Sequence, residues 1–300
     1  MDATDLTTAR AVQTELVAVI VGVRAGAPQV LTTRADPLGL PSGPLRDDHR
    51  SMQAALRSWV EEQTGLNLGY VEQLYTFADR DRRGLAGERV LSVSYLALTR
   101  ASARASAGSW LNWYHLYPWE DRREPSPALL DEALTLWADD DPARQLRCAV
   151  TFGLDGRPWL PDLALQRYEV LYEAGLIPES PAFDGRLGVE IVGPRLLHDH
   201  RRILATGIGR LRAKIQYRPV VFELMPNAFT LGQLQACVEA IAGQPVHKQN
   251  FRRLVAQQNL VEETGGRTTE TGGRPARLYR FRSEITDERS ASGTKLPRTR

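Results

Sequence analysis

The sequence has little cysteine, no long apolar run and no strong net charge. Only Cys148 and Cys237 occur among the 300 residues, without a CxxC pair, and the histidines do not cluster at metal-ligand spacing. This argues against a disulfide scaffold and a zinc site. No apolar run approaches the roughly 20 residues that span a bilayer, and the N-terminus has no basic region followed by an apolar one. We therefore expect a cytoplasmic protein without a membrane partner.

The charge is distributed unevenly along the chain. The formal net charge is +2, but the segment from Gln244 to Arg300 carries 12 Lys+Arg and 6 Asp+Glu, a net of +6. The residues before it therefore carry −4. A mildly acidic body with a basic end is typical of a protein with a C-terminal module that binds nucleic acid.

The first part of the chain reads as strands around one helix, and the middle part as helices. Apolar runs and turn residues predict strands over 16–23, 29–33, 71–77, 89–99 and 110–116, and a helix over 51–65. Helical periodicity then runs over 126–180 and again over 199–215, where Gly207 and Gly209 each weaken the helix by about 1 kcal/mol. The pattern predicts the α+β class with a sandwich of mixed sheets.

Near the C-terminus the elements follow the order helix, helix, helix, hairpin. Thr230 and Gln233 match a capping box, and a second helix begins near Lys248 with Phe251, Leu254 and Val255 expected inward. Two short strands, 260–264 and 276–281, flank a Gly-rich turn, and the basic helix before Pro219 supplies the first helix. This is the order of a winged helix-turn-helix.

The basic residues of this module suit duplex DNA. A helix fits the major groove, where Arg and Lys pair with guanine and Gln or Asn with adenine, and a wing with Arg267, Arg274 and Arg277 is suited to phosphates. The alternative is a small helical domain whose arginines form a solvated face.

The segment "LPSGPLRDDHRSMQAALRSWVEEQTGL" resembles a Nudix box with missing carboxylates. That box places glutamates on one helix face, where they hold divalent cations that activate water. Counted from Gly43, the four glutamate positions hold His49, Ser58, Glu61 and Glu62, and Arg57 keeps its place. Counted back from Gly65, Trp59 and Gln63 replace glutamates and only Glu62 remains. Because Trp, Ser and Gln cannot supply hard anionic ligands, metal chemistry is compromised in either register. An ordinary amphipathic helix between strands is the simpler interpretation.

Together, the eroded box, "NFRR" and "GRPARLY" resemble the Nudix-related transcriptional regulators of NAD metabolism, the NrtR-like family. The resemblance implies a Nudix-like α/β/α sandwich followed by a winged helix-turn-helix, in a homodimeric repressor that is not an enzyme. It implies a palindromic double-stranded DNA operator and ADP-ribose, or a related nucleotide, as effector, with no required cofactor, no metal and no catalytic residue. The expected segments are a Nudix-like domain (1–125), a helical insertion (126–195), a linker helix with the winged helix (196–283) and a disordered tail (284–300).

Lys248, Asn250, Arg252 and Arg253 match the family's recognition-helix segment, and Arg274 matches its wing; the other expected site residues follow from their charge and position. The expected DNA-binding residues are Lys248, Gln249, Asn250, Arg252, Arg253, Arg267, Arg274 and Arg277. The expected effector-binding residues are Arg57, Glu61, Glu62, Glu72, Arg80 and Arg83.

Two other functions fit the sequence. One is a Mg²⁺-dependent Nudix pyrophosphatase acting on ADP-ribose, with Glu61 and Glu62 as metal ligands. The other is an interaction scaffold in which the aromatic segment "WLNWYHLYPWED" supplies a partner surface, although such density is more often core or dimer seam.

Overall fold

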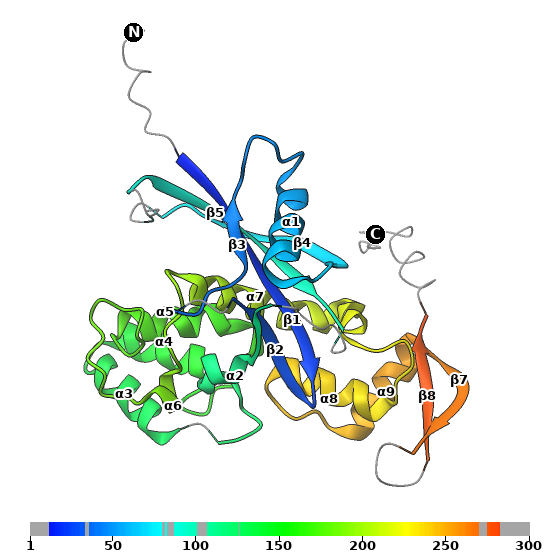
Figure 1. The fold of residues 1–300 in the computed structure, drawn as a ribbon. Coiled ribbons are helices and arrows are strands. Elements are labelled where there is room, and N and C mark those ends of the chain that lie inside the picture. Colours follow the sequence, from blue (N-terminus) through cyan, green and yellow to red (C-terminus); the bar gives the residue numbers. More distant parts are fainter. Residues whose placement is uncertain are drawn as a thin grey trace, which may run out of the picture.

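The computed structural model describes residues 12–33, 36–79, 82, 87–100, 107–125, 127–269 and 275–282 (Figure 1). Its strands are β1 (Val12–Arg24), β2 (Ala27–Thr32), β3 (Ser42–Pro44), β4 (Tyr70–Phe77), β5 (Arg89–Leu98), β6 (Ser109–Asn112), β7 (Val261–Thr268) and β8 (Ala276–Phe281). Its α-helices are α1 (Met52–Thr64), α2 (Trp113–Leu116), α3 (Ala128–Ala138), α4 (Pro142–Phe152), α5 (Ala164–Glu173), α6 (Val189–Val192), α7 (His200–Tyr217), α8 (Leu231–Ala242) and α9 (Lys248–Gln258). Three 3-10 helices complete the set: η1 (Pro118–Glu120), η2 (Pro161–Leu163) and η3 (Pro219–Leu224).

A mixed sheet forms the centre of the N-terminal part. Its strand order is β4-β5-β1-β2-β6, and β3 pairs with β1 off this path. β1 pairs parallel with β5 and antiparallel with β2 and β3. Every residue of β1 from Leu16 to Val21 is buried, because the strand lies in the middle of the sheet and helices cover both of its faces.

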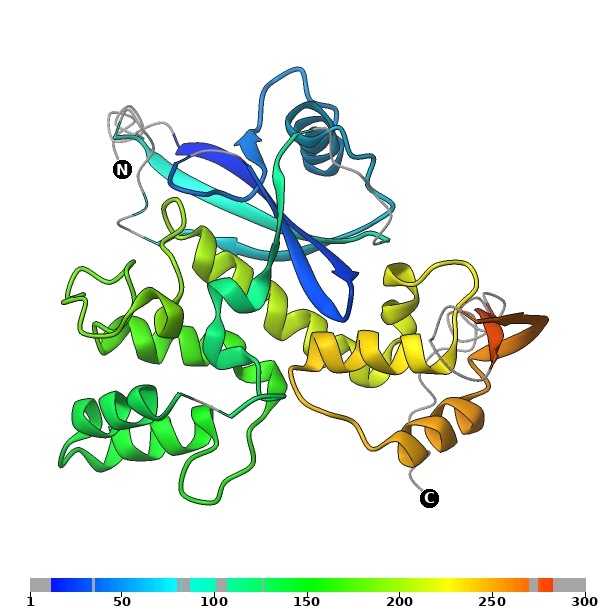
Figure 2. The ribbon, with the colours of Figure 1, turned by 60° about the horizontal axis from the view of Figure 1, so that its bottom comes forward.

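The alternation of side chains along β1 separates the two layers of core. Leu16, Ala18 and Ile20 belong to the core that includes Leu56 and Val60 of α1. Val17, Val19 and Val21 belong to the larger core that includes Leu204 and Ile208 of α7. Figure 2 shows the sheet between α1 and α7. The predicted α/β/α sandwich is confirmed, and its second helical layer comes from α7, which begins 176 residues after the end of β1.

The two glycines of α7 serve close packing. A Cβ atom at Gly207 would lie 2.9 Å from Cγ1 of Val19, and one at Gly209 would lie 2.8 Å from the carbonyl oxygen of Asp162. Glycine therefore lets α7 approach both the sheet and η2, and the resulting burial offsets its low helix propensity. None of the helices in the described residues is long and apolar enough to cross a membrane.

The helical region from α3 to α6 packs into the same core as the sheet. Leu130 and Leu134 of α3, Phe152 of α4 and Tyr168 of α5 all join the cluster that contains Val17 and Val19. The region lies on the opposite side of the molecule from the C-terminal hairpin in both views (Figures 1 and 2). The apolar periodicity of the sequence did not separate α4 from the neighbouring helices. Its ends are nevertheless marked by local residues: Asp141 caps the first turn, Pro142 is the first residue of the helix and Gly153 follows its last residue.

The predicted strand over 110–116 is wrong in its second half. β6 stops at Asn112, whose side chain accepts a hydrogen bond from the amide of Tyr114 (3.0 Å) and so caps α2. The side chains of Trp113 and Tyr117 are fully buried, and Trp119 is almost so. The aromatic segment is therefore core, and it does not offer the partner surface that the scaffold hypothesis requires.

The C-terminal part contains the predicted order of elements, and it differs from the prediction in the length of β7, the exposure of Leu254 and an additional pairing of Phe229. The capping box of Thr230 and Gln233 is confirmed. β7 extends through the expected turn to Thr268. Leu254 is 51% exposed, because α9 faces the core through Phe251 and Val255, four residues apart. Phe229 also forms an antiparallel bridge with Tyr279 of β8 through two backbone hydrogen bonds of 2.9 and 2.8 Å. The sequence did not predict this bridge.

The expected segment boundaries at 125, 195 and 283 stay predictions. The expected disordered tail, 284–300, lies outside the described residues.

Candidate nucleic-acid interface and effector cavity

The turn between α8 and α9 is held by side chains of α8. Gln235 Nε2 donates to the carbonyl oxygen of Val246 (2.9 Å), and Glu239 Oε1 accepts from the amide of the same residue (2.9 Å). α8 ends at Gly243. Because both backbone polar groups of Val246 bond to α8, the start of α9 is fixed relative to that helix.

The outer face of α9 is basic and exposed. Lys248, Gln249, Asn250, Arg252 and Arg253 are all exposed, and α9 contains no acidic residue. Arg252 and Arg253 have no acidic partner among the described residues. Phe251 and Val255 anchor the opposite face in the core. The structure therefore places five of the eight predicted DNA-binding residues on one protruding helix, with their donors free for a ligand.

The hairpin carries three of the predicted residues. Arg267 and Arg277 are exposed and lie directly opposite each other on β7 and β8. Like charges in such a cross-strand pair destabilise a hairpin. Arg277 also pairs with Glu263 (2.6 Å), so Arg267 is the less neutralised of the two. Arg274 lies outside the described residues.

The helix of the eroded Nudix box, α1, is attached to β3 through positions where the box has glutamate. Trp59 Nε1 donates to the carbonyl oxygen of Pro44 (3.0 Å). Gln63 bonds to both backbone polar groups of Ser42, at 2.7 and 3.2 Å. Among the described residues, no three His, Cys, Asp or Glu side chains gather as a metal site. Counted back from Gly65, Trp59 and Gln63 stand at glutamate positions of the box, and both bond to the backbone of β3.

The predicted effector residues on α1 and β4 do not line the large cavity of the molecule. Arg57 donates to the carbonyl oxygens of Leu68 and Gly69, in the connection between α1 and β4. Glu61 and Glu62 are exposed. Glu72 pairs with Lys214 of α7 and accepts from the hydroxyl of Tyr70 (2.6 Å). Arg80 and Arg83 lie outside the described residues.

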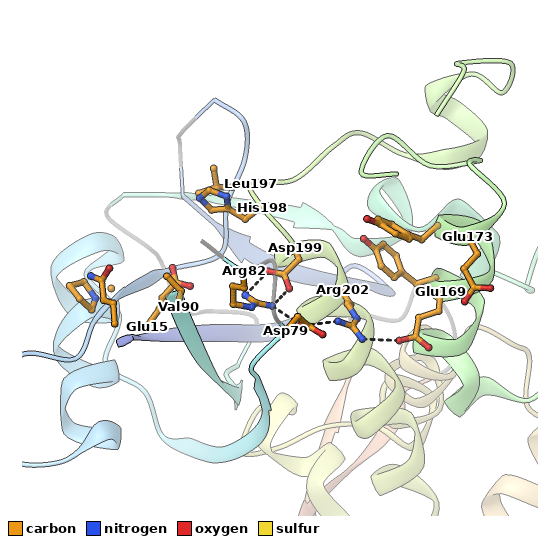
Figure 3. Close-up of a pocket in the computed structure, with 15 residues that line it drawn as sticks. Glu15, Asp79, Arg82, Val90, Glu169, Glu173, Leu197, His198, Asp199 and Arg202 are labelled. Carbon is orange, nitrogen blue, oxygen red and sulfur yellow. Dashed lines mark hydrogen bonds and ion pairs between the residues drawn. The ribbon is translucent and has the colours of Figure 1, made fainter. Parts of the chain in front are cut away.

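A cavity of about 1090 Å³ opens between the sheet and the helical region. Its walls come from the first half of β1, from β3, from the β4–β5 connection, from α5 and from the start of α7 (Figure 3). The acidic lining residues are Glu15, Asp79, Glu169, Glu173 and Asp199. The basic ones are Arg82 and Arg202, and the aromatic ones include Tyr168 and Tyr172 of α5. Its volume is sufficient for a nucleotide.

The charged groups of the cavity form an alternating chain, drawn with dashed lines in Figure 3. Arg82 pairs with Asp199, at 2.7 Å for one of its two bonds, and lies 3.8 Å from Asp79. Arg202 pairs with Asp79 and with Glu169, each at 3.1 Å. Burial lowers the pKa of Arg82, but an arginine stays protonated at neutral pH. Both guanidinium groups are therefore held inside the cavity by carboxylates from three different segments.

Sequence reasoning named Arg80 and Arg83 but missed Arg82, Asp199 and Arg202. All three lie in charged stretches, "RDRRG" and "DHRR", whose pattern does not show which side chain turns inward. Only the contact between the β4–β5 connection and the start of α7 selects them, through the pairing of residues 117 positions apart.

The comparisons with known proteins agree with this architecture. Residues 221–281 match the family model described as the NrtR DNA-binding winged helix domain. This segment begins within η3, so α7, which was expected to be the first helix of the module, precedes it. The structure of Shewanella oneidensis NrtR in complex with a 27mer DNA is similar over 91% of this chain and 95% of that one, with 21% identity and a TM-score of 0.57.

The chain has the fold of NrtR, and its residues 221–281 match the model of the NrtR winged helix domain. A MutT/nudix family protein from Enterococcus faecalis is also similar, with 16% identity, 94% coverage of both chains and a TM-score of 0.55. In sequence, 86 residues are 41% identical to the ADPR responsive transcriptional repressor NtrR of Acinetobacter baylyi. That match covers 29% of this chain and 34% of the relative, about a third of its length. The likeness to NrtR is thus strongest in the fold and in the winged helix.

Proposed function

We propose that this protein is a transcriptional repressor that binds DNA through α9 and the β7–β8 hairpin and releases it in response to ADP-ribose or a related nucleotide. The observation that carries the proposal is the exposed basic face of α9 within a segment matched by the NrtR winged helix model. We infer a cytoplasmic homodimer on a palindromic operator, in genes of NAD metabolism. The similar DNA-bound NrtR structure and the ADPR-responsive relative support this inference.

We infer that the effector binds in the cavity rather than on α1. The cavity has the volume for a dinucleotide-sized ligand, two guanidinium groups for a pyrophosphate, and carboxylates and tyrosines for ribose hydroxyls and a base. Its wall includes the start of α7, which continues to the winged helix. An effector that prefers one arrangement of α7 would change DNA affinity by its difference in affinity for the two arrangements.

We infer further that the Nudix-like domain senses its ligand without hydrolysing it. Counted from Gly43, two of the four box carboxylates remain, Glu61 and Glu62. Counted back from Gly65, only Glu62 remains, and the tryptophan and glutamine at two other glutamate positions bond to β3. Asp79, Glu169 and Asp199 of the cavity are already paired with arginine. Without a group of free carboxylates, a divalent cation and its activated water are poorly held.

Selection of genomic fragments with the purified protein tests the proposed function. At low salt the protein is expected to enrich a palindromic duplex, and saturating ADP-ribose is expected to lower its affinity for that duplex about 10-fold or more in a mobility-shift titration. The same samples, incubated with Mg²⁺, report any release of AMP. Absence of duplex binding, or affinity unchanged by ADP-ribose and NAD together with robust AMP release, would contradict the proposal.

Replacing Arg202 by alanine is expected to weaken ADP-ribose binding about 10-fold or more, measured by titration calorimetry, because one of two pyrophosphate partners is removed. Arg57→Ala is the matched control, since Arg57 lies on α1 and bonds to backbone carbonyls instead. Its effect is expected to be less than about 2-fold. Loss of binding in Arg57→Ala with normal binding in Arg202→Ala would place the effector on α1.

A further inference from the structure

A buried ion cluster joins the end of α8 to the sheet and the helices that precede α8, together called the body of the molecule. The side chains of Glu120, Arg167 and Arg212 have no exposed surface. They come from η1, α5 and α7. Glu120 accepts two hydrogen bonds from Arg167, at 2.6 and 2.9 Å, and its second carboxylate oxygen also pairs with Arg212. The cluster contains two cations and one anion, so it holds one positive charge in excess.

Backbone carbonyls compensate this excess charge. Arg167 donates to the carbonyl oxygens of Thr151 (2.8 Å) and Leu160 (2.9 Å) within the body. Arg212 Nε donates to the carbonyl oxygen of Ile241 (2.8 Å), in the last turn of α8. The unpaired carbonyls at a helix C-terminus carry the negative end of its dipole. α8 therefore supplies part of the negative charge that Arg212 needs, and detaching α8 would leave that guanidinium under-compensated in the core.

Two further bonds and a close contact fix the same end of α8. The hydroxyl of Tyr114 donates to the carbonyl oxygen of Ala240 (2.6 Å). The backbone amide of Arg122 donates to the carbonyl oxygen of Gly243 (2.7 Å). Gly243 has φ of 73°, and a Cβ atom there would overlap the carbonyl oxygen of Glu120. These interactions join α8 to the segment that runs from α2 through η1.

A continuous path of contacts links the cavity to the recognition surface. α7 carries Arg202 in the cavity near its start and Arg212 in the cluster ten residues later, and it lies between the helical region and α8 in Figure 2. The C-terminal end of α8 leads directly into the turn that Gln235 and Glu239 attach to α8, and α9 follows this turn. These contacts connect α7 to the start of α9 by way of the C-terminal end of α8.

We propose that Glu120, Arg167 and Arg212 form a clamp that holds α8, and with it α9, in a single orientation relative to the sheet, and that α7 transmits effector binding to this clamp. The clamp itself rests on the buried ion pairs and on the bonds to the end of α8. Only its part in the response to nucleotide rests on the proposed function.

Distances between spin labels on α1 and α9 test the clamp in the full chain. Cysteines introduced at the exposed Gln53 and Gln257 accept the labels, while Cys148 and Cys237 are buried. Labelled chain is diluted with unlabelled chain, so that only distances within one chain are measured. Arg212→Lys keeps the charge but cannot reach Glu120 and Ile241 together, and it is expected to widen the distance distribution about twofold or more.

Arg201→Lys is the matched control. Arg201 is equally buried, and its partners, Glu179 and the carbonyl oxygens of Leu116 and Val192, all belong to the body. The distribution of label distances in Arg201→Lys is expected to stay narrow. If Arg212→Lys does not fold, Tyr114→Phe is compared with Tyr117→Phe, because the hydroxyl of Tyr117 bonds within the body, to the carbonyl of Arg201. If the distance distributions of the test variant and its control are equally wide, in whichever of the two pairs folds, the proposed clamp is wrong.

The response to nucleotide is measured separately with unlabelled protein. If wild-type affinity for DNA falls about 10-fold with ADP-ribose, the fall in Arg212→Lys or Tyr114→Phe is expected to shrink to about 2-fold or less. A full response in these variants would overturn the transmission through α7. Failure of the wild type to bind DNA would overturn the proposed function, while the label distances would still decide the clamp.

Discussion

Replacing Arg252 and Arg253 together by alanine is expected to lower affinity for the selected operator about 100-fold. Each arginine that contacts a base or phosphate contributes roughly 1–3 kcal/mol, so removing both side chains weakens binding by about two orders of magnitude or more. Phe251 and Val255 hold α9 in place from the opposite face, so the fold is expected to survive the change. The measurement is a mobility-shift titration over a range of salt concentrations.

The salt dependence separates specific contact from general attraction. Each phosphate contact removed is expected to reduce the slope of log affinity against log salt by about one. The control is the double variant Arg144→Ala and Arg186→Ala, which removes the same charge from exposed arginines of the helical region. It is expected to change affinity by less than about 3-fold. Equal losses of affinity in the two double variants would show that net charge, and not α9, determines binding.

Replacing Glu120 by glutamine is expected to cost about 3–5 kcal/mol of the free energy of unfolding at pH 7. The change keeps the shape of the side chain but leaves Arg167 and Arg212 buried without their carboxylate. Urea unfolding followed by circular dichroism measures it. The control is Glu173→Gln, whose partner Arg147 and whose own carboxylate are both well exposed. Its cost is expected to be below about 1 kcal/mol, and an equal cost for both variants would contradict the role assigned to the cluster.

The same substitution has a predictable pH dependence. Burial by itself raises the pKa of Glu120, but the charges of Arg167 and Arg212 outweigh it, so the pKa of the folded state is lowered. The unfolded state binds a proton first on acidification, so the stabilisation is complete above the unfolded pKa of about 4.3 and is lost as pH falls through the folded value. The difference between wild type and Glu120→Gln is therefore expected to be constant near neutral pH and to shrink below about pH 4.3. If the difference in free energy of unfolding between wild type and Glu120→Gln grew as the pH fell, the predicted direction of the pH dependence would be wrong.

Local chemistry made several elements predictable. The ends of α1 and α8 are marked by residues whose side chains or φ angles act within one turn: Ser51 and Gly65 for the first, Thr230 and Gly243 for the second. The basic face of α9 follows from the spacing of Phe251 and Val255, which turns the arginines outward. Leu254 shows the limit of this reasoning, because an apolar residue one position from the buried stripe lies exposed.

The proposed effector cavity was less predictable, since its lining residues are brought together by contacts between distant segments. Arg82 is separated from Asp199 by 117 residues, and Arg202 is separated from Asp79 by 123. No spacing in the sequence relates them. The damaged box is a local motif and therefore points to α1, whereas the cavity is lined by β1, α5 and the start of α7.

The sequence by itself determined the order of elements, the α+β class, the loss of box carboxylates and the place of the basic helix, because each depends on neighbours within a few turns of chain. Only the tertiary structure decided that the aromatic segment is core, that Arg82 and Arg202 line a cavity, and that Glu120 lies between Arg167 and Arg212 at the end of α8. These outcomes depend on which charged and apolar groups are removed from water together, and that is set by the packing of α7 against the sheet, the helical region and α8 at once.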